Sequence, residues 1–389
     1  MQHTGRHSRR RLRRAAVAMQ VVVCSTVILG MGALAIDVGK LYLARTELQR
    51  AADASALAGA SAYLDNVGLI QSPELGELAC ERAQAFSCAN WTLGTPTILD
   101  AADVVAGTLD LNDPHGALDT SGTQRFNAVQ VLVRRAAGSS NGSISYSFAR
   151  IFGFAEGEAE AGATAAMDDR FSSYEQTEEY GLLLPFTVHK DTYEEMLVSG
   201  PDTFSYDAVH DEVDETSDEV REVRVYPYRE KKEGGGSDGA GNFGLLNVGS
   251  ENQGVPALEE QIRNGIAPAD LELEVGTSLL TFVDEDGSPV TYDITGSPGL
   301  KAGVEDAVVD RLGDIVAFFL YDQVTESGSN AVYRMVGMRF GRVMCIDLHG
   351  NPNDKRLVIQ PVAYTGAGVI VTTNAPSSDG QVGRLRLVR

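Results

Sequence analysis

Residues 15–36 read AAVAMQVVVCSTVILGMGALAI, and residues 37–60, which follow without a break, read DVGKLYLARTELQRAADASALAGA. The first stretch holds 22 residues without a charge, and seventeen of them are Ala, Val, Ile, Leu, Met or Cys. A helix of about 20 such residues crosses the ~30 Å hydrocarbon core of a bilayer. We therefore predict a transmembrane helix over residues 15–36.

The flank before this span predicts its orientation. Residues 1–14 contain six Arg and no acidic residue, and cationic flanks stay in the cytoplasm. We expect a cytoplasmic N-terminus, with the bulk of the chain on the other side of the membrane. The alternative is a secretory signal cleaved after Ala33-Leu34-Ala35. The apolar run is longer than the usual signal core of about 7–15 residues, so we expect the span to be retained.

The segment after the span favours a continuing helix, which we predict over residues 37–64. Leu41 and Leu48 repeat at a spacing of seven residues, which is typical of one helix face. Ala, the strongest helix former, fills seven of the twelve positions 51–62. The transmembrane helix should therefore extend beyond the bilayer as an Ala-rich helix.

A row of small residues runs along this extension, because Ala52, Ala56 and Ala60 follow at a spacing of four. Small rows let helices approach each other closely. The row could pack on the chain's own outer domain or on a partner helix, and we favour the partner because other single-span subunits would lie within reach at the membrane. The candidate packing residues are Leu41, Leu48, Ala52, Ala56 and Ala60.

Residues 35–60 as a whole strongly resemble the N-terminus of TadE/TadG-like proteins of the bacterial tight-adherence (Flp) pilus assembly system. The segment Gly241-Asn242-Phe243-Gly244-Leu245-Leu246 is similar to a recurrent turn of TadG-related outer domains. The resemblance implies a component of pilus assembly or related export in the bacterial inner (cytoplasmic) membrane, without established catalysis. It also implies pilins or other pilus-assembly proteins as partners.

Two motifs of related proteins are missing from this sequence. Prepilins carry Gly, four residues and then Glu before the apolar run, whereas Gly5 is followed by a basic and polar stretch. Longer TadG members carry a von Willebrand A domain with a D-x-S-x-S metal motif. The nearest match, Asp53-Ala54-Ser55-Ala56-Leu57, lacks the second Ser. We expect neither prepilin processing nor that metal site.

Strand-like runs outnumber helical ones in the rest of the chain and do not alternate with them, which predicts an α+β fold with mostly antiparallel sheets. Two such runs are Phe126–Arg134 and Ser143–Ile151, and Asn141-Gly142 between them predicts a hairpin. The Gly-rich stretch 231–241 reads as a linker or loop. The predicted organisation is a basic flank (1–14), transmembrane helix (15–36), extension helix (37–64), first outer domain (65–230), linker (231–241) and second outer domain (242–389).

Charge and composition exclude several classes of function. The chain carries a net charge of −22, and residues 15–389 alone carry −28. Nucleic-acid binding needs cationic patches, so we expect no nucleic-acid partner. G-x-G-x-x-G occurs at Gly239–Gly244, but the polar stretch before it does not fit the strand that a dinucleotide site requires. We expect no catalytic, cofactor-binding or metal-binding residues and no small-molecule substrate.

Two features leave their interpretation open. The acidic stretch 207–222 is typical of a solvated loop or edge, and a site for a cation or a basic partner is the alternative. A short helix is predicted from Pro73 to Phe86, and it carries Cys80. Cys80 and Cys88 could form a disulfide only if this helix ends near Phe86, because eight residues of one continuous helix separate its ends by about 12 Å.

The leading hypothesis is a non-enzymatic, single-pass component of Tad/Flp pilus assembly or related protein export. Two alternatives belong to other classes. One is a free-standing envelope adhesive or binding protein, and the other is a membrane-tethered envelope hydrolase.

Overall fold

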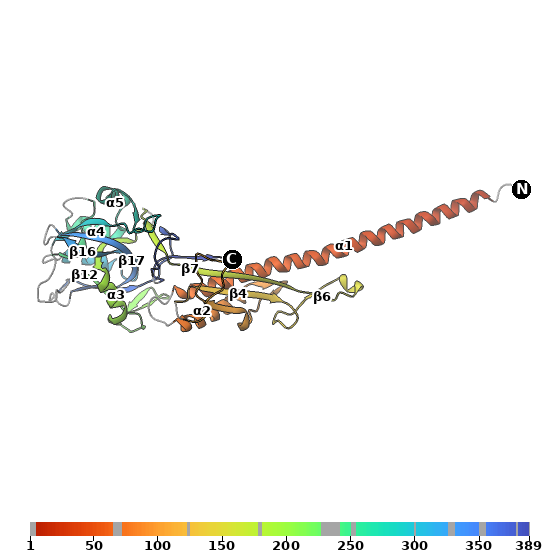
Figure 1. Cartoon of the computed structure of the whole chain (residues 1–389), viewed down its shortest axis with the longest axis horizontal. Helices are drawn as coiled ribbons and strands as arrows, with labels where there is room; N and C mark the ends of the chain where they lie inside the picture. Colours follow the sequence, from red (N-terminus) through yellow and green to blue (C-terminus); the bar gives the residue numbers. More distant parts are fainter. Residues whose placement is uncertain are drawn as a thin grey trace.

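The computed structural model describes residues 5–64, 72–122, 125–177, 181–226, 242–249, 254–298, 301–325, 331–349, 355–378 and 380–388. Its longest element is the helix α1, Gly5–Ala60, which has 56 residues and spans about 84 Å at 1.5 Å per residue. A 3₁₀ turn, η1 (Ser61–Tyr63), follows it. The N-terminal half of α1 projects from the molecule, while its C-terminal half lies within the folded part (Figure 1). The predicted span and its Ala-rich extension are thus one continuous helix.

The C-terminal half of α1 packs on an antiparallel sheet of four strands in the order β20-β7-β4-β3 and on the helix α2 (Ser72–Ser87). The bounds of the strands are β3 Val104–Gly107, β4 Ala128–Arg135, β7 Ala159–Asp168 and β20 Arg384–Leu387.

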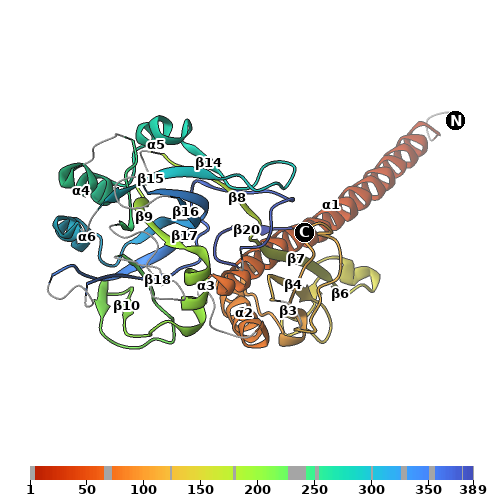
Figure 2. The same cartoon turned by 60° about the vertical axis from the view of Figure 1, so that its left-hand side comes forward.

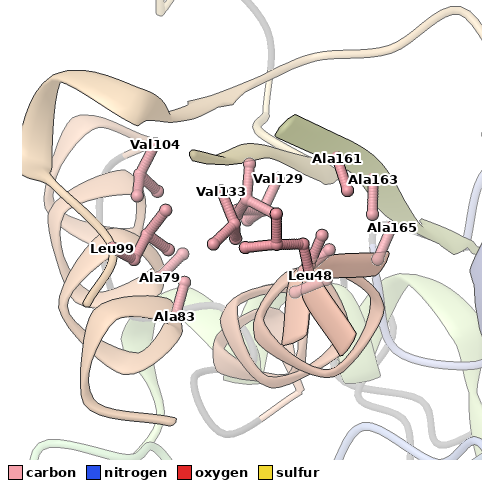
Figure 3. Close-up of a cluster of buried hydrophobic side chains, with 14 of the residues drawn as sticks. Leu48, Ala79, Ala83, Leu99, Val104, Val129, Val133, Ala161, Ala163 and Ala165 are labelled. Atoms are coloured by element: carbon pink, nitrogen blue, oxygen red, sulfur yellow. The ribbon is translucent and has the colours of Figure 1, made fainter. Parts of the chain in front are cut away.

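Successive side chains of a strand point to opposite faces of a sheet. In β4 and β7, every second residue is a small or β-branched apolar residue, so one face of the sheet is apolar and packs against α1. Val129, Val131 and Val133 of β4 are buried in one cluster with Leu48 of α1. Four alternate positions of β7 are alanines in the same cluster, and Figure 3 shows Leu48 lying between the valines and these alanines. The alanines are Ala159, Ala161, Ala163 and Ala165.

A second sheet has seven strands in the order β12-β18-β17-β15-β13-β9-β16. The strand β16 pairs with both β9 and β17, so the pairing closes into a ring. The β9–β16 pair is parallel, and the other pairs of this sheet are antiparallel. The bounds are β9 Leu183–His189, β12 Val223–Tyr226, β13 Asn242–Leu246, β15 Tyr292–Pro298, β16 Ile315–Thr325, β17 Val332–Asp347 and β18 Arg356–Pro361.

The strand β16 is buried on both faces. Phe318 and its alternate neighbours belong to one hydrophobic cluster, while Phe319 and its alternate neighbours belong to another. The helices of this part are α3 Lys190–Ser199, α4 Val255–Asn264, α5 Pro268–Val275 and α6 Glu305–Val309. In Figure 2, α4 and α6 lie on the side of this part away from α1, whereas α3 lies on the side toward α1 and α2.

Smaller elements complete the chain. A three-stranded sheet has the order β14-β8-β19, and three two-stranded hairpins are β1–β2, β5–β6 and β10–β11. Their bounds are β1 Trp91–Thr92, β2 Thr95–Pro96, β5 Ile144–Ser145, β6 Glu156–Gly157, β8 Phe171–Glu175, β10 Ser205–Asp207, β11 Glu212–Asp214, β14 Leu279–Thr281 and β19 Val369–Val371. The remaining 3₁₀ turns are η2 Ala101–Asp103, η3 Ala149–Phe152 and η4 Ala302–Val304.

The predicted α+β class with mostly antiparallel sheets is confirmed. The predicted hairpin at Asn141-Gly142 is wrong, because β4 pairs with β3 and β7 whereas β5 pairs with β6. Gly142 does lie in a turn with a φ of 64°. The Gly-rich stretch 231–241 lies outside the described residues, and the domain bounds stay a prediction.

Candidate membrane anchor and its junction with the outer domain

The N-terminal half of α1 exposes apolar side chains on all sides. Met19, Ile28 and Leu29 expose 68–72% of their surface, and most other side chains between residues 17 and 36 are also exposed. A helix that is hydrophobic all round is typical of a membrane span or of a fully covered core helix. Of the helices that the structure describes, α1 alone is long and apolar enough to cross a membrane.

The candidate packing residues lie on the other half of the same helix. Leu48, Ala52, Ala56 and Ala60 have no exposed surface and belong to the cluster formed with β4, β7 and α2. Leu41 is partly buried against the same cluster. The structure therefore places the small-residue row on the chain's own outer domain. The partner helix that we favoured for this row is not supported, because these side chains offer no free surface.

Small residues on both sides explain this close packing. Dispersion contacts accumulate only where surfaces meet without gaps, and alanines on α1 and β7 permit that approach. Gly59 marks the tightest point. A Cβ at this position would lie 2.9 Å from the carbonyl oxygen of Ala79 and 3.1 Å from Val129 Cγ1.

Asp37, the first charged residue after the apolar run, joins α1 to a distant loop. Its side chain is 2% exposed and accepts hydrogen bonds from three backbone N–H groups. The Ser147 nitrogen lies 2.7 Å from Oδ1, and the nitrogens of Phe148 and Ala149 lie 2.9 and 2.6 Å from Oδ2. Beside it, Lys40 Nζ donates to the carbonyl oxygen of Ser145 at 2.6 Å.

The charged form of Asp37 is favoured at this junction. Burial raises the pKa of the carboxyl, but the three N–H donors and the nearby Lys40 lower it, and the net pKa lies below its usual value. The sequence analysis did not single out Asp37. Its signal was its position directly after 22 uncharged residues.

Polar side chains hold the edges of the docked helix. Glu47 accepts the backbone N–H of Leu93 at 2.7 Å, and Gln49 donates to the carbonyl oxygen of Gly162 at 3.1 Å. These contacts reach the turn between β1 and β2 and the backbone of β7. The helix α1 and the folded part of the chain therefore meet in an extensive contact.

A cleft of about 720 Å³ lies between residues 108–127, the end of β7 and the C-terminal segment. Asp169 and Arg170 line it, and both are engaged in holding the structure. Asp169 accepts the backbone N–H of Gly380 at 2.8 Å, and Arg170 donates to Asp168 at 2.9 Å. These interactions fix the surrounding loops.

Three side chains could meet around a cation, namely Glu305, Asp347 and His349, whose ligand atoms lie within 4.8 Å of one another. His349 Nδ1 lies 2.7 Å from Glu305, and Glu305 also accepts the backbone N–H of Leu348 at 2.9 Å. These contacts connect the residues that follow β17 to the first residue of α6. The cluster therefore has a structural role in holding these two elements together.

Cys80 and Cys88 are both free thiols. The helix α2 ends at Ser87, one residue beyond Phe86, so the condition for a bridge is met. Both thiols are nevertheless free, because the seven helical steps from Cys80 to Ser87 already place Cys88 about 10 Å along the axis from Cys80, beyond the reach of a disulfide.

The comparisons with known proteins bear on α1 alone. Residues 15–62 match a family model described as putative Flp pilus-assembly TadE/G-like. No curated protein and no solved structure matches the chain. The matched residues begin with the apolar run and end in η1, so they comprise both the exposed half and the docked half of the helix.

Proposed function

We propose that this chain, whose residues 15–62 form a TadE/G-like segment, is a non-enzymatic, single-pass component of Tad/Flp pilus assembly or a related protein export machine. The supporting observation is the way one helix serves two environments. Its first half exposes apolar surface that only a membrane or apolar partners would cover, and its second half forms the core of the outer domain. Partners that meet the span would thus be coupled directly to the outer domain.

The proposed location is the bacterial inner membrane, with the N-terminus in the cytoplasm. The six Arg of residues 1–14 support this orientation. The uncharged run of 22 residues gives about 33 Å of helix, which matches the hydrocarbon core. Pilins or other pilus-assembly proteins are the proposed partners.

The test is an in-frame deletion of the gene in a piliated strain, complemented with the intact chain. We expect the deletion to abolish surface pili and the intact chain to restore them. A deletion strain that keeps its pili but loses attachment to surfaces would support an adhesive protein instead. A strain that keeps both pili and attachment would refute the proposal, and the envelope hydrolase would then be the next function to assay.

A further inference from the structure

Four large apolar side chains are exposed within seven residues of the outer domain. Ile151, Phe152 and Phe154 expose 79%, 72% and 66% of their surface, and Phe148 exposes 37%. We call residues 146–155 the aromatic loop. Single exposed apolar residues are common, but a group of this size marks a surface that another apolar phase covers.

Backbone hydrogen bonds fix the shape in which the loop presents these side chains. Tyr146 donates to the carbonyl oxygen of Ala155 at 3.0 Å, and Phe154 donates to that of Ala149 at 3.1 Å. Gly153 closes η3 with a φ of 90°, a conformation that favours glycine. The apolar side chains therefore extend from a closed turn and not from a loose end.

The position of the loop along α1 points to what covers it. Asp37 accepts the N–H groups of Ser147, Phe148 and Ala149, so the loop is bound to the first residue after the apolar run. Figure 1 shows the β5–β6 region as the part of the outer domain that lies farthest toward the N-terminal half of α1.

The dimensions of a bilayer indicate how deep the aromatic loop would lie relative to the membrane surface. If residues 15–36 fill the hydrocarbon core, the headgroup layer, about 5–8 Å thick on each side, lies level with residues 37–41. The aromatic loop is fixed at that level. Aromatic side chains are enriched in this layer, and Phe148, Phe152 and Phe154 are the exposed aromatic side chains of the loop.

We propose that the aromatic loop inserts into the interfacial layer of the same bilayer that α1 crosses, as a second membrane contact. This inference rests on the proposed single-pass anchor, because the loop is bound to the residue that directly follows the span. Two contacts, one helix and one loop, would fix the tilt of the outer domain on the membrane surface. Lipid is the proposed partner that covers the aromatic loop. The test below distinguishes it from another protein bound to the same surface.

The test uses the full-length protein, one copy per nanodisc, in a mixture of lipids that carry bromine either close to the headgroup or close to the methyl end of the acyl chain. Bromine is a contact quencher of tryptophan fluorescence, so this mixture reports on both the interfacial layer and the centre of the core. The chain has one Trp, Trp91, which lines a pocket beside Arg50, about 20 Å along α1 from Asp37. The wild type is therefore the unquenched reference. Two variants in a Trp91→Phe background report depth, namely Val27→Trp inside the span and Phe152→Trp in the loop.

We expect brominated lipid to remove most of the fluorescence of the Val27→Trp and Phe152→Trp variants and to leave the wild type unchanged. Adding Asp37→Asn should reduce the quenching of the Phe152→Trp variant alone, since it frees the loop from α1. Quenching of Val27→Trp without quenching of Phe152→Trp would overturn the loop proposal, leave the anchor intact and point to a protein as the covering partner. Quenching of neither variant would refute the anchor itself.

Discussion

At the residue scale, Asp37 connects the exposed apolar half of α1 to the folded part of the chain. A carboxylate with three backbone N–H donors is strongly favoured in its charged form, because each donor stabilises the negative charge. Those donors belong to residues more than a hundred positions away in the sequence. One side chain thereby determines where the aromatic loop lies relative to the end of the span.

We predict that Asp37→Asn loosens the loop, because an amide cannot accept all three hydrogen bonds. Amide hydrogen exchange of residues 147–149 in the full-length protein should show lower protection factors. Asp284→Asn is the matched control, since Asp284 accepts the N–H groups of Asp286 and Ser288 in a separate turn. Equal protection at 147–149 in both variants would contradict this role of Asp37.

The same carboxylate predicts a pH dependence. Its pKa is lowered in the folded chain, so its stabilising effect is present above the usual carboxyl value of about 3.9. The effect is lost as the pH falls through the lower folded value. Protection of residues 147–149 should therefore remain constant from neutral pH to about pH 5 and decline in stronger acid. In the Asp37→Asn variant this decline should be absent.

Gly59 and Gly39 form a matched pair on α1. Replacing a helical Gly with Ala ordinarily stabilises a helix by about 0.5–1 kcal/mol. Gly39 has nothing within 4 Å of a new Cβ, so Gly39→Ala should raise the free energy of unfolding. Gly59→Ala should lower it by about 1–3 kcal/mol, because the new methyl would collide with Ala79 and Val129. Denaturation of the detergent-solubilised chain measures both, and equal signs would refute the tight packing.

At the scale of elements, α1 is one helix with two different surfaces. The exposed N-terminal half needs apolar side chains, but their shape matters little because no other described element packs on them. The C-terminal half needs small side chains that fit against β7 and α2. The two halves should therefore differ in their tolerance of added volume.

We predict that Ala56→Leu destabilises the outer domain by about 1–3 kcal/mol, because Ala56 is fully buried. Ala54, two residues away and partly exposed, is the control, and Ala54→Leu should change stability by no more than about 0.5 kcal/mol. The amount of folded protein in membranes should fall for Ala56→Leu only. Normal protein levels with lost pili would instead indicate that the row faces a partner.

The elements differ in how well the sequence predicted them. The predictions for α1 and α2 depended on local periodicity and agree with the structure. The helix α3 was missed because Lys190–Ser199 is short and has a weak apolar pattern. The pairing of β16 with β9 and β17 depends on contacts distant in sequence, which no local pattern encodes.

The candidate site shows the same limit. The apolar run and the row of alanines could be recognised in the sequence. A sequence pattern does not show which surface packs against these side chains. Residues 143–151 were predicted as a strand because they are rich in aromatic and β-branched side chains. Only Ile144–Ser145 is a strand, and the apolar residues that follow are exposed in the aromatic loop. Aromatic and β-branched side chains are typical of strands, and the proposed membrane-contacting loop contains the same residue types. Composition alone therefore cannot distinguish the two structures.

At the scale of the whole molecule, the arrangement is a long helix with a folded part at one end (Figure 1). The acidic bulk carries −28 and the first fourteen residues carry all of the basic excess. In the proposed topology, the membrane separates these two regions.

Reporter fusions test this topology. Alkaline phosphatase, which is active only outside the cytoplasm, should be active when it is fused after Gly200 and inactive when it is fused after Arg14. Membrane levels of both fusions are the control, because a degraded fusion is also inactive. The reverse pattern would contradict the cytoplasmic N-terminus.

The central claim is that the chain works in pilus assembly as a membrane-anchored protein. The most direct measurement counts surface pili in a deletion strain that expresses either the intact chain or a chain whose residues 1–36 are replaced by a cleavable secretion signal. Equal amounts of protease-resistant outer domain in both strains establish that each protein folds. We predict pili with the intact chain and none with the released outer domain. Normal pili with the released outer domain would contradict the claim.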